Sequence, residues 1–285
     1  MIEILKHIVL GMVQGLSEFL PISSSGHIKL FQHIFGYTGE ENLFVSIMLH
    51  LGTLVAVLIV YHKLIWELIT EAFKAIGDIF KGKFSFKQMN SNRRMLVMLI
   101  LATAMLGIMI IPLGEHSLKD YIEMLNGCES IVPLGFAFLF TGILLILTFY
   151  FNRKNKNIHN DATVKDALVI GGAQCIATIS GISRSGSTMA SGLLCGLSRE
   201  YMVKFSFIMS IPAILAAALS DAKDAIAGEI SVDMVPLFFG IVSAMVFGIL
   251  AIKLIEWLIR KDRYSLFGYY CLALGSFVLI YSLVS

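Results

Sequence analysis

The segment Leu10–His27 reads LGMVQGLSEFLPISSSGH, and the segment Ile170–Ser187 in the second half of the chain reads IGGAQCIATISGISRSGS. The two segments align without a gap. The identical positions are Gly11, Gln14, Ile22, Ser23, Ser25 and Gly26 in the first segment, and Gly171, Gln174, Ile182, Ser183, Ser185 and Gly186 in the second. The chain therefore consists of two related halves, and each half carries a cluster of serine and glycine among apolar residues.

The two copies differ at the positions that carry reactive side chains. The differing pairs are Glu18 and Thr178, Ser24 and Arg184, and His27 and Ser187. The first copy supplies a carboxylate and an imidazole, whereas the second supplies a guanidinium. Because unsatisfied polar groups at membrane depth are costly, such residues are kept there mainly to bind or react. The pattern indicates one composite site assembled from both halves.

The composition places the chain in a membrane. It is 57% hydrophobic and 15% charged, with a mean hydropathy of +0.81, which excludes a soluble globular protein. Apolar runs of roughly 17–25 residues, the length that crosses a bilayer, predict six transmembrane helices. They lie at 44–62, 95–112, 132–151, 204–220, 236–258 and 265–284. The net charge of +2 argues against a nucleic-acid partner.

Charged residues alternate in sign from one loop to the next. Loops 63–94, 152–165 and 260–263 are basic, whereas loops 113–131 and 221–235 are acidic. Since cytoplasmic loops carry the excess of lysine and arginine, the basic loops are predicted to lie inside the cell and the acidic loops outside. With this orientation both termini are extracytoplasmic.

Neither motif segment can cross the membrane just once. The span that follows the first segment begins outside, on the same side as the N-terminus, and the span that follows the second begins inside, on the same side as loop 152–165. Each segment is predicted to be a re-entrant helix hairpin, at about 2–36 and about 164–199. With three spans each, the hairpins make two repeats, 1–151 and 160–285, of a single membrane domain, 1–285. The predicted fold is an all-α integral membrane protein with six transmembrane helices and two re-entrant hairpins in an inverted-topology repeat.

The motifs carry the groups that phosphoryl transfer needs. Gln14 and Glu18 are four residues apart and share one helix face. Each serine cluster opens a helix, where free backbone N–H groups favour an anion. Candidate phosphate-binding residues are Ser23, Ser25, Gly26, Ser183, Ser185 and Gly186, and candidate catalytic residues are Glu18, Ser24, His27 and Arg184. His27 is expected within reach of the Ser24 hydroxyl, and Arg184 is suited to clamping phosphate oxygens.

Four further histidines lie outside the two motif segments. They are His50, His62, His116 and His159, and none has an evident partner in the sequence. We interpret them as structural or solvated residues.

The first motif, Gln14-Gly-Leu-Ser-Glu-Phe-Leu-Pro-Ile-Ser-Ser-Ser-Gly-His27, resembles the first signature of the undecaprenyl-diphosphatase family of the bacitracin-resistance type. Gly181-Ile-Ser-Arg-Ser-Gly186 resembles the second signature, and the likeness covers the whole chain, including His50-Leu-Gly-Thr53. The resemblance implies an enzyme of the bacterial plasma membrane that hydrolyses undecaprenyl diphosphate to the monophosphate. Such an enzyme recycles the lipid carrier of cell-wall synthesis and gives bacitracin resistance. The matching catalytic positions are Glu18, Ser24, His27 and Arg184.

The resemblance further implies a divalent cation, Mg²⁺ or Ca²⁺, for which Glu18 is the expected ligand. Many members of the family carry an acid at the position of Gln14, so Gln14 is a weaker ligand here. A second departure concerns the other motif, which usually begins Pro-Gly and here begins Ser180-Gly181.

The leading hypothesis is a lipid diphosphatase whose active site opens to the outer face. Its partners are a polyprenyl diphosphate substrate and membrane lipids. The sequence leaves the attacking group open between Ser24, His27 and water, and it leaves the oligomeric state open, a homodimer included. The alternative is a secondary transporter or lipid-carrier flippase on the same inverted repeat, an architecture common among transporters. Hydrolysis and flipping can also be combined in one protein.

Overall fold

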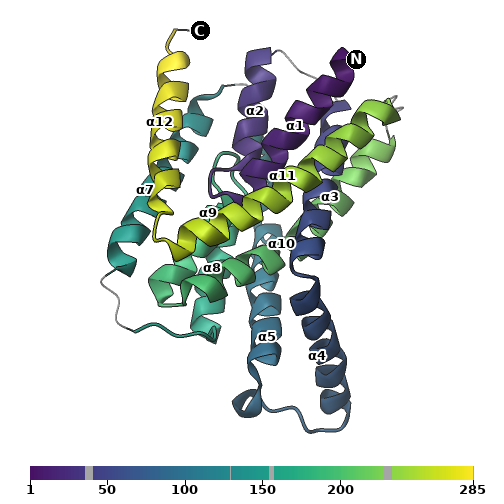
Figure 1. Cartoon of the computed structure of the whole chain (residues 1–285), viewed down its shortest axis with the longest axis vertical. Helices are drawn as coiled ribbons and strands as arrows, with labels where there is room; N and C mark the ends of the chain where they lie inside the picture. Colours follow the sequence, from purple (N-terminus) through teal and green to yellow (C-terminus); the bar gives the residue numbers. More distant parts are fainter. Residues whose placement is uncertain (36–40, 129, 154–156, 228–232, 285) are drawn as a thin grey trace.

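The computed structural model is built almost entirely of α-helices (Figure 1). It describes residues 1–35, 41–128, 130–153, 157–227 and 233–284. The helices are α1 (Ile2–Phe19), α2 (Ser24–Phe35), α3 (Glu41–Val60), α4 (His62–Phe80), α5 (Ser91–Ala104), α6 (Leu118–Asn126), α7 (Val132–Asn152), α8 (Val164–Ile176), α9 (Arg184–Cys195), α10 (Arg199–Ala227), α11 (Met234–Arg260) and α12 (Ser265–Tyr281). Short 3-10 turns lie at η1 (Phe86–Gln88) and η2 (Met105–Ile110), and β1 (Pro112–Leu113) pairs antiparallel with β2 (His116–Ser117). The predicted all-α class is confirmed.

Four helical segments of the described chain are long and apolar enough to cross a membrane. They are Ser91–Ile110, Val132–Asn152, Arg199–Leu219 and Met234–Arg260, and they coincide with four of the six predicted spans. The span predicted at 44–62 is α3, which bends by 84° into α4. The span predicted at 265–284 is α12, which is apolar but has 17 residues. The chain is therefore a multi-pass membrane protein.

Each motif segment forms two helices joined by a turn, as predicted; α1 has 18 residues, and α2, α8 and α9 have 12 or 13. Residues 20–23 separate α1 from α2, and residues 177–183 separate α8 from α9. Residue 36, the predicted end of the first hairpin, lies outside the described residues. The two turns meet in the interior, where the Ser185 hydroxyl donates to the Leu20 carbonyl at 3.2 Å. A Cβ atom added at Gly26 would lie 3.0 Å from the Gly181 Cα, so the backbones touch there.

Glycines at matching motif positions let each hairpin approach a different long helix. A Cβ at Gly11 of α1 would lie 2.2 Å from the Gly240 carbonyl oxygen of α11. A Cβ at Gly171 of α8 would lie 2.6 Å from the Ala102 carbonyl oxygen of α5. Small residues of this kind allow the close backbone contact that membrane helices use to associate. Thus α1 is fixed against α11, and α8 against α5.

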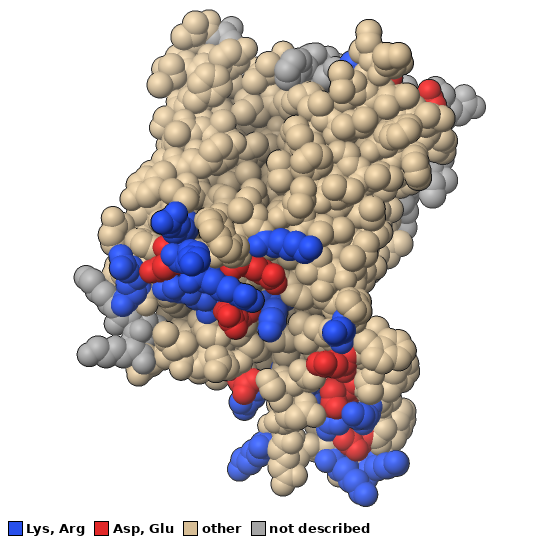
Figure 2. Space-filling view, viewed as in Figure 1, with Lys and Arg blue, Asp and Glu red and all other residues tan. Residues whose placement is uncertain are grey.

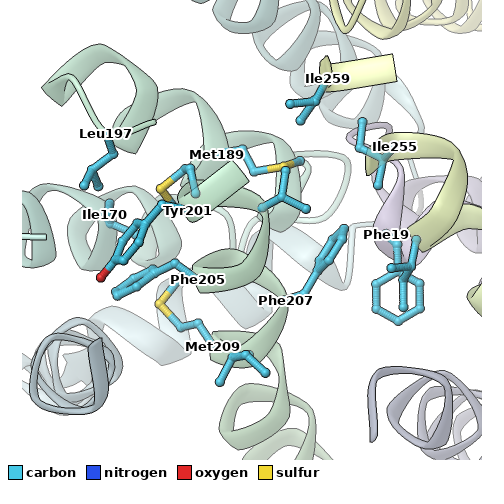
Figure 3. Packing of buried hydrophobic residues seen from close by; sticks show 14 of the residues in the cluster. Phe19, Ile170, Met189, Leu197, Tyr201, Phe205, Phe207, Met209, Ile255 and Ile259 are labelled. Carbon is cyan, nitrogen blue, oxygen red and sulfur yellow. The ribbon is translucent and has the colours of Figure 1, made fainter. Parts of the chain in front are cut away.

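The largest group of buried apolar side chains lies beside the hairpin turns (Figure 3). Phe19 of α1 is fully buried, and its ring meets the edge of Phe207 of α10 at 5.3 Å between centroids. Ile255 and Ile259 of α11 line the same cluster. Phe19 directly follows Glu18, so this packing fixes the end of α1 that carries the carboxylate.

Charged residues gather on one side of the molecule. Figure 2 shows lysine, arginine, aspartate and glutamate on the lower part of the face in view, below an almost uncharged upper part. Arg153 and Arg199 both pair with Asp262, which joins the basic loops at 152–165 and 260–263 to the start of α10. Both termini lie at the opposite, upper end in Figure 1. Residues 228–232 of the acidic loop predicted at 221–235 lie outside the described residues.

The adjacent glycines of α8 provide a test of this packing. A methyl group at Gly171 would collide with α5, whereas Gly172 has nothing within 4 Å of an added Cβ. Gly171→Ala should therefore destabilise the protein by about 1–3 kcal/mol, because the two helices must separate. Gly172→Ala should be neutral or slightly stabilising, because alanine is the better helix former. Thermal unfolding in detergent compares the two, and equal unfolding temperatures would contradict the close α8–α5 contact.

Candidate active site

A cavity of about 240 Å³ lies where the two hairpin turns meet. Both motifs contribute to its wall, and α3 and α10 complete it. The predicted site residues that line the cavity are Glu18, Ser23, Ser24, Ser25, Ser183 and Arg184. The structure therefore brings a carboxylate and a hydroxyl cluster of the first half against a guanidinium of the second.

Glu18 is the centre of the polar contacts in the cavity. Its Oε1 accepts from Arg184 Nη2 at 2.5 Å, and its Oε2 accepts from the Ser24 hydroxyl at 2.6 Å. The Gln14 side chain also donates to Oε2, at 3.0 Å, from one helical turn earlier on the same face of α1. The Glu18 side chain is only 6% exposed, so its charge depends on these donors rather than on water.

Arg184 is the first residue of α9 and reaches across to the other hairpin. Its Nη1 donates to the Ser206 carbonyl of α10 at 3.5 Å, while Nη2 holds Glu18. A guanidinium has five N–H donors in a planar fork. The two contacts fix its plane and leave further donors for the oxygens of an anion in the cavity.

The serines that precede α2 and α9 cap these helices in the same way. Ser23 Oγ accepts from the Gly26 N–H at 3.3 Å, and Ser183 Oγ accepts from the Gly186 N–H at 3.0 Å. Gly26 and Gly186 thus donate their N–H groups to the capping serines. Because they have no side chains, the two turns can pack against each other. Ser23 has a φ of 72°, the left-handed region that serine rarely adopts.

Ser25 and Ser185 stand beside the two caps. The hydroxyl of Ser25 lies 3.4 Å from that of Ser23, and the hydroxyl of Ser185 lies 3.2 Å from that of Ser183. Ser185 is additionally bonded to the Leu20 carbonyl and does not line the cavity, whereas Ser25 does. The hydroxyl of Ser25 is therefore the better placed of the two to contact a ligand.

His27 faces away from Ser24, contrary to the expected contact. Its Nδ1 bonds the Ser23 carbonyl and its Nε2 bonds the Tyr270 hydroxyl, each at 2.7 Å. The imidazole also stacks on the Tyr270 ring, with 5.7 Å between centroids. The reason is helical geometry: a side chain three residues into α2 points to the face that packs on α12, whereas Ser24 at the helix start points into the cavity.

His50, which we interpreted from the sequence as structural or solvated, is an imidazole of the cavity wall. It comes from α3, lines the cavity, and places Nε2 at 3.6 Å from Glu18 Oε2. Its Nδ1 lies 2.8 Å from the Ser46 carbonyl, to which it donates, and Nε2 faces the cavity. Only the His50-Leu-Gly-Thr53 resemblance signalled it, because His50 lies outside both motifs.

Residues 7–277 match the family described as Bacitracin resistance protein BacA. The chain belongs to this family. An undecaprenyl-diphosphatase of Bacteroides thetaiotaomicron is 37% identical over 97% of this chain and 98% of its own length. One of Methanosphaera stadtmanae is 38% identical over the full length of both chains, and one of Alkaliphilus metalliredigens is 36% identical over 98% of each. The residues that match the family model, 7–277, include both motifs and His50.

The cavity offers few ligands for a cation. The described residues contain no group of three or more histidine, cysteine, aspartate or glutamate side chains that could hold a metal ion. Glu18 supplies one carboxylate, and the Gln14 amide next to it supplies one neutral oxygen. Mg²⁺ is commonly bound by one or two carboxylates together with substrate phosphates. The residues therefore fit a cation that arrives with a diphosphate, and they do not form a cage on their own.

The Glu18–Arg184 pair should show strong coupling in a double-mutant cycle. Arg184→Met leaves the buried carboxylate without its partner, a change that costs up to about 3–5 kcal/mol. Glu18→Gln in the same chain removes the unpaired charge and should recover much of the loss. Thermal unfolding of both single variants and the double variant measures the coupling. Additive losses would contradict a direct buried ion pair.

Proposed function

We propose that this cavity is where the terminal phosphate of undecaprenyl diphosphate is removed. The chain is an undecaprenyl-diphosphatase of the bacitracin-resistance family, and its products are undecaprenyl phosphate and phosphate. The observation that carries the assignment of the site is the contact of Glu18 with both Ser24 and Arg184 inside a cavity between the hairpins. A carboxylate, a hydroxyl and a guanidinium at one point are the groups that phosphoryl transfer uses.

Binding of the diphosphate rests on Arg184 and the start of α2. The free donors of the guanidinium can clamp two phosphate oxygens. The backbone N–H groups of Ser24 and Ser25 lie in the first turn of α2, where no carbonyl of the same helix can accept from them. These groups and the positive end of the helix dipole favour a phosphate beside the Ser25 hydroxyl.

Ser24 is the attacking group that the hydrogen bonds favour. Its hydroxyl already donates to Glu18 Oε2, so the carboxylate can accept the proton as Oγ attacks the terminal phosphorus. The new bond joins Oγ to phosphorus, and the bridging P–O bond breaks with its electron pair on undecaprenyl phosphate. Water then hydrolyses the phosphoserine, and the proton returns to Oγ. Arg184 stabilises the charge on the phosphoryl oxygens throughout.

His50 is proposed as the imidazole of the site in place of His27. Its Nε2 faces Glu18, whereas both ring nitrogens of His27 are engaged by Ser23 and Tyr270. His50 is thus placed to orient the carboxylate or the attacking water, and His27 to hold α2 against α12. The divalent cation, Mg²⁺ or Ca²⁺, would bind to Glu18 and, more weakly, to Gln14, and it would neutralise charge on the diphosphate.

The proposed topology is the inverted repeat with six spans and two re-entrant hairpins in the bacterial plasma membrane. Two observations support it. The matching glycines Gly11 and Gly171 pack on α11 and α5, which hold equivalent places in the two halves. Most lysines and arginines in view lie toward the end opposite both termini, in agreement with the positive-inside rule. Glu18 and Ser24 have no carboxylate or serine counterpart in the second hairpin, an asymmetry that a transporter or flippase would not require. The cavity is proposed to open outward.

Ser24 and Ser25 form a matched pair for testing the nucleophile. Ser24→Ala should abolish phosphate release from undecaprenyl diphosphate while leaving substrate binding nearly intact, because the missing oxygen acts in the transition state. Ser25→Ala and Ser23→Ala should be milder, since backbone N–H groups can still hold phosphate. The measurement is phosphate release by the purified protein in detergent. Equal and modest losses at all three serines would assign the attack to water.

The two imidazoles should respond differently to substitution. His50→Gln should lower kcat at least about 100-fold, the lower end for an acid–base group, with an unchanged unfolding temperature. His27→Gln should lower the unfolding temperature, because it removes the contacts to Tyr270 and Ser23. Tyr270→Phe should reproduce that loss. Full activity of the His50 variant would remove His50 from the site.

A further inference from the structure

The helix α4 carries a stripe of exposed apolar side chains that the active site does not use. Trp66, Ile69, Phe73, Ile76 and Phe80 recur every three or four residues, and each is at least 42% exposed. Such spacing places all five on one face of the helix. We call this set the α4 stripe. A continuous exposed apolar face of this kind marks a surface that contacts lipid or protein.

The opposite face of α4 makes ionic and polar contacts with the start of α5. Glu71 is buried and accepts from Arg93 Nε at 3.2 Å, and Arg93 Nη1 reaches Asp78 at 2.7 Å. Glu67 accepts from Asn92 at 3.0 Å. These contacts hold α4 against the start of α5 and turn the α4 stripe outward. The orientation of the stripe is therefore fixed by the structure.

Two contacts link α4 to the basic ends of two membrane spans. Arg93 lies in the first turn of the span Ser91–Ile110. At the other end of α4, the hydroxyl of the preceding Tyr61 donates to Glu256 at 2.7 Å, and Glu256 lies in the last turns of α11. Both spans have their basic ends here. The chain also turns by 84° between α3 and α4, so α4 does not continue the direction of α3.

We propose that the α4 stripe inserts into the headgroup region of the inner leaflet and that α4 is an interfacial anchor. Aromatic side chains are enriched at this depth, and Trp66 and Phe73 are the two most exposed residues of the stripe before its last turn. Exposed lysines follow the stripe at Lys81, Lys83 and Lys87, and Lys63 precedes it. Lysines beside an apolar helix face favour a surface of anionic phospholipid. Because α3 carries His50 and runs into α4, the anchor would also fix the lower end of a helix that lines the cavity.

The chain has two tryptophans, Trp66 and Trp257, which makes the proposal directly testable. A Trp257→Phe variant, reconstituted in vesicles, leaves Trp66 as the single fluorescent reporter. We expect its emission to shift to shorter wavelength, to be quenched by phospholipids brominated on their acyl chains, and to be protected from iodide. Quenching by iodide and not by brominated lipid would place the stripe in water and overturn the proposal.

A second copy of the chain is the other occupant that the experiment distinguishes. Burial between two copies would protect Trp66 from both quenchers, and the protection would fall as the protein is diluted in lipid. That result would also overturn the proposal. The lysines are tested by replacing Lys81, Lys83 and Lys87 with glutamine. In the parent protein we expect brominated lipids to quench Trp66 more strongly when phosphatidylglycerol replaces part of the phosphatidylcholine. The glutamine variant should lose this increase. An unchanged increase in the variant would count against the anionic surface.

Discussion

The structure depends on one buried ion pair, Glu18 with Arg184, which joins the two halves of the chain at the tips of their hairpins. A carboxylate that is only 6% exposed is stable in an apolar protein because a guanidinium, a hydroxyl and an amide all donate to it. The same contacts position these groups for chemistry. Arg184 is held with donors to spare, and the Ser24 proton already points at the carboxylate that can accept it.

The surrounding fold keeps the two hairpin tips in contact. Gly11 and Gly171 allow α1 and α8 to lie directly against long helices, and Phe19 locks the residue next to Glu18 into the largest buried cluster. Ser23 and Ser183 each satisfy one N–H group in the first turn of the following helix, that of Gly26 and that of Gly186. The polar groups at the centre of the protein are thus held by packing and capping, which suits a site that must stay preorganised in a membrane.

The two motifs and their contact could be predicted well, because duplication and hydrophobic periodicity are visible in the sequence itself. The membrane spans follow from the apolar runs, and the helix–turn–helix form of each motif and the contact of Glu18 with Ser24 and Arg184 follow from the repeated segment. Contacts between distant segments were harder to predict. His27 lies close to Ser24 in sequence but turns toward Tyr270, since neighbouring positions on a helix face different sides. His50 enters the cavity from α3, and no spacing rule relates it to either motif. The bend after α3 was equally hidden, because apolar composition does not record direction.

The central claim is that a guanidinium from one half and a carboxylate from the other act as one site. The most direct measurement is phosphate release from undecaprenyl diphosphate by purified Arg184→Lys, alongside its unfolding temperature. Lysine keeps the charge that stabilises Glu18 but lacks the planar fork that can hold Glu18 and two phosphate oxygens together. We predict a folded protein that has lost most of its turnover. Near-normal turnover in that variant would contradict the account.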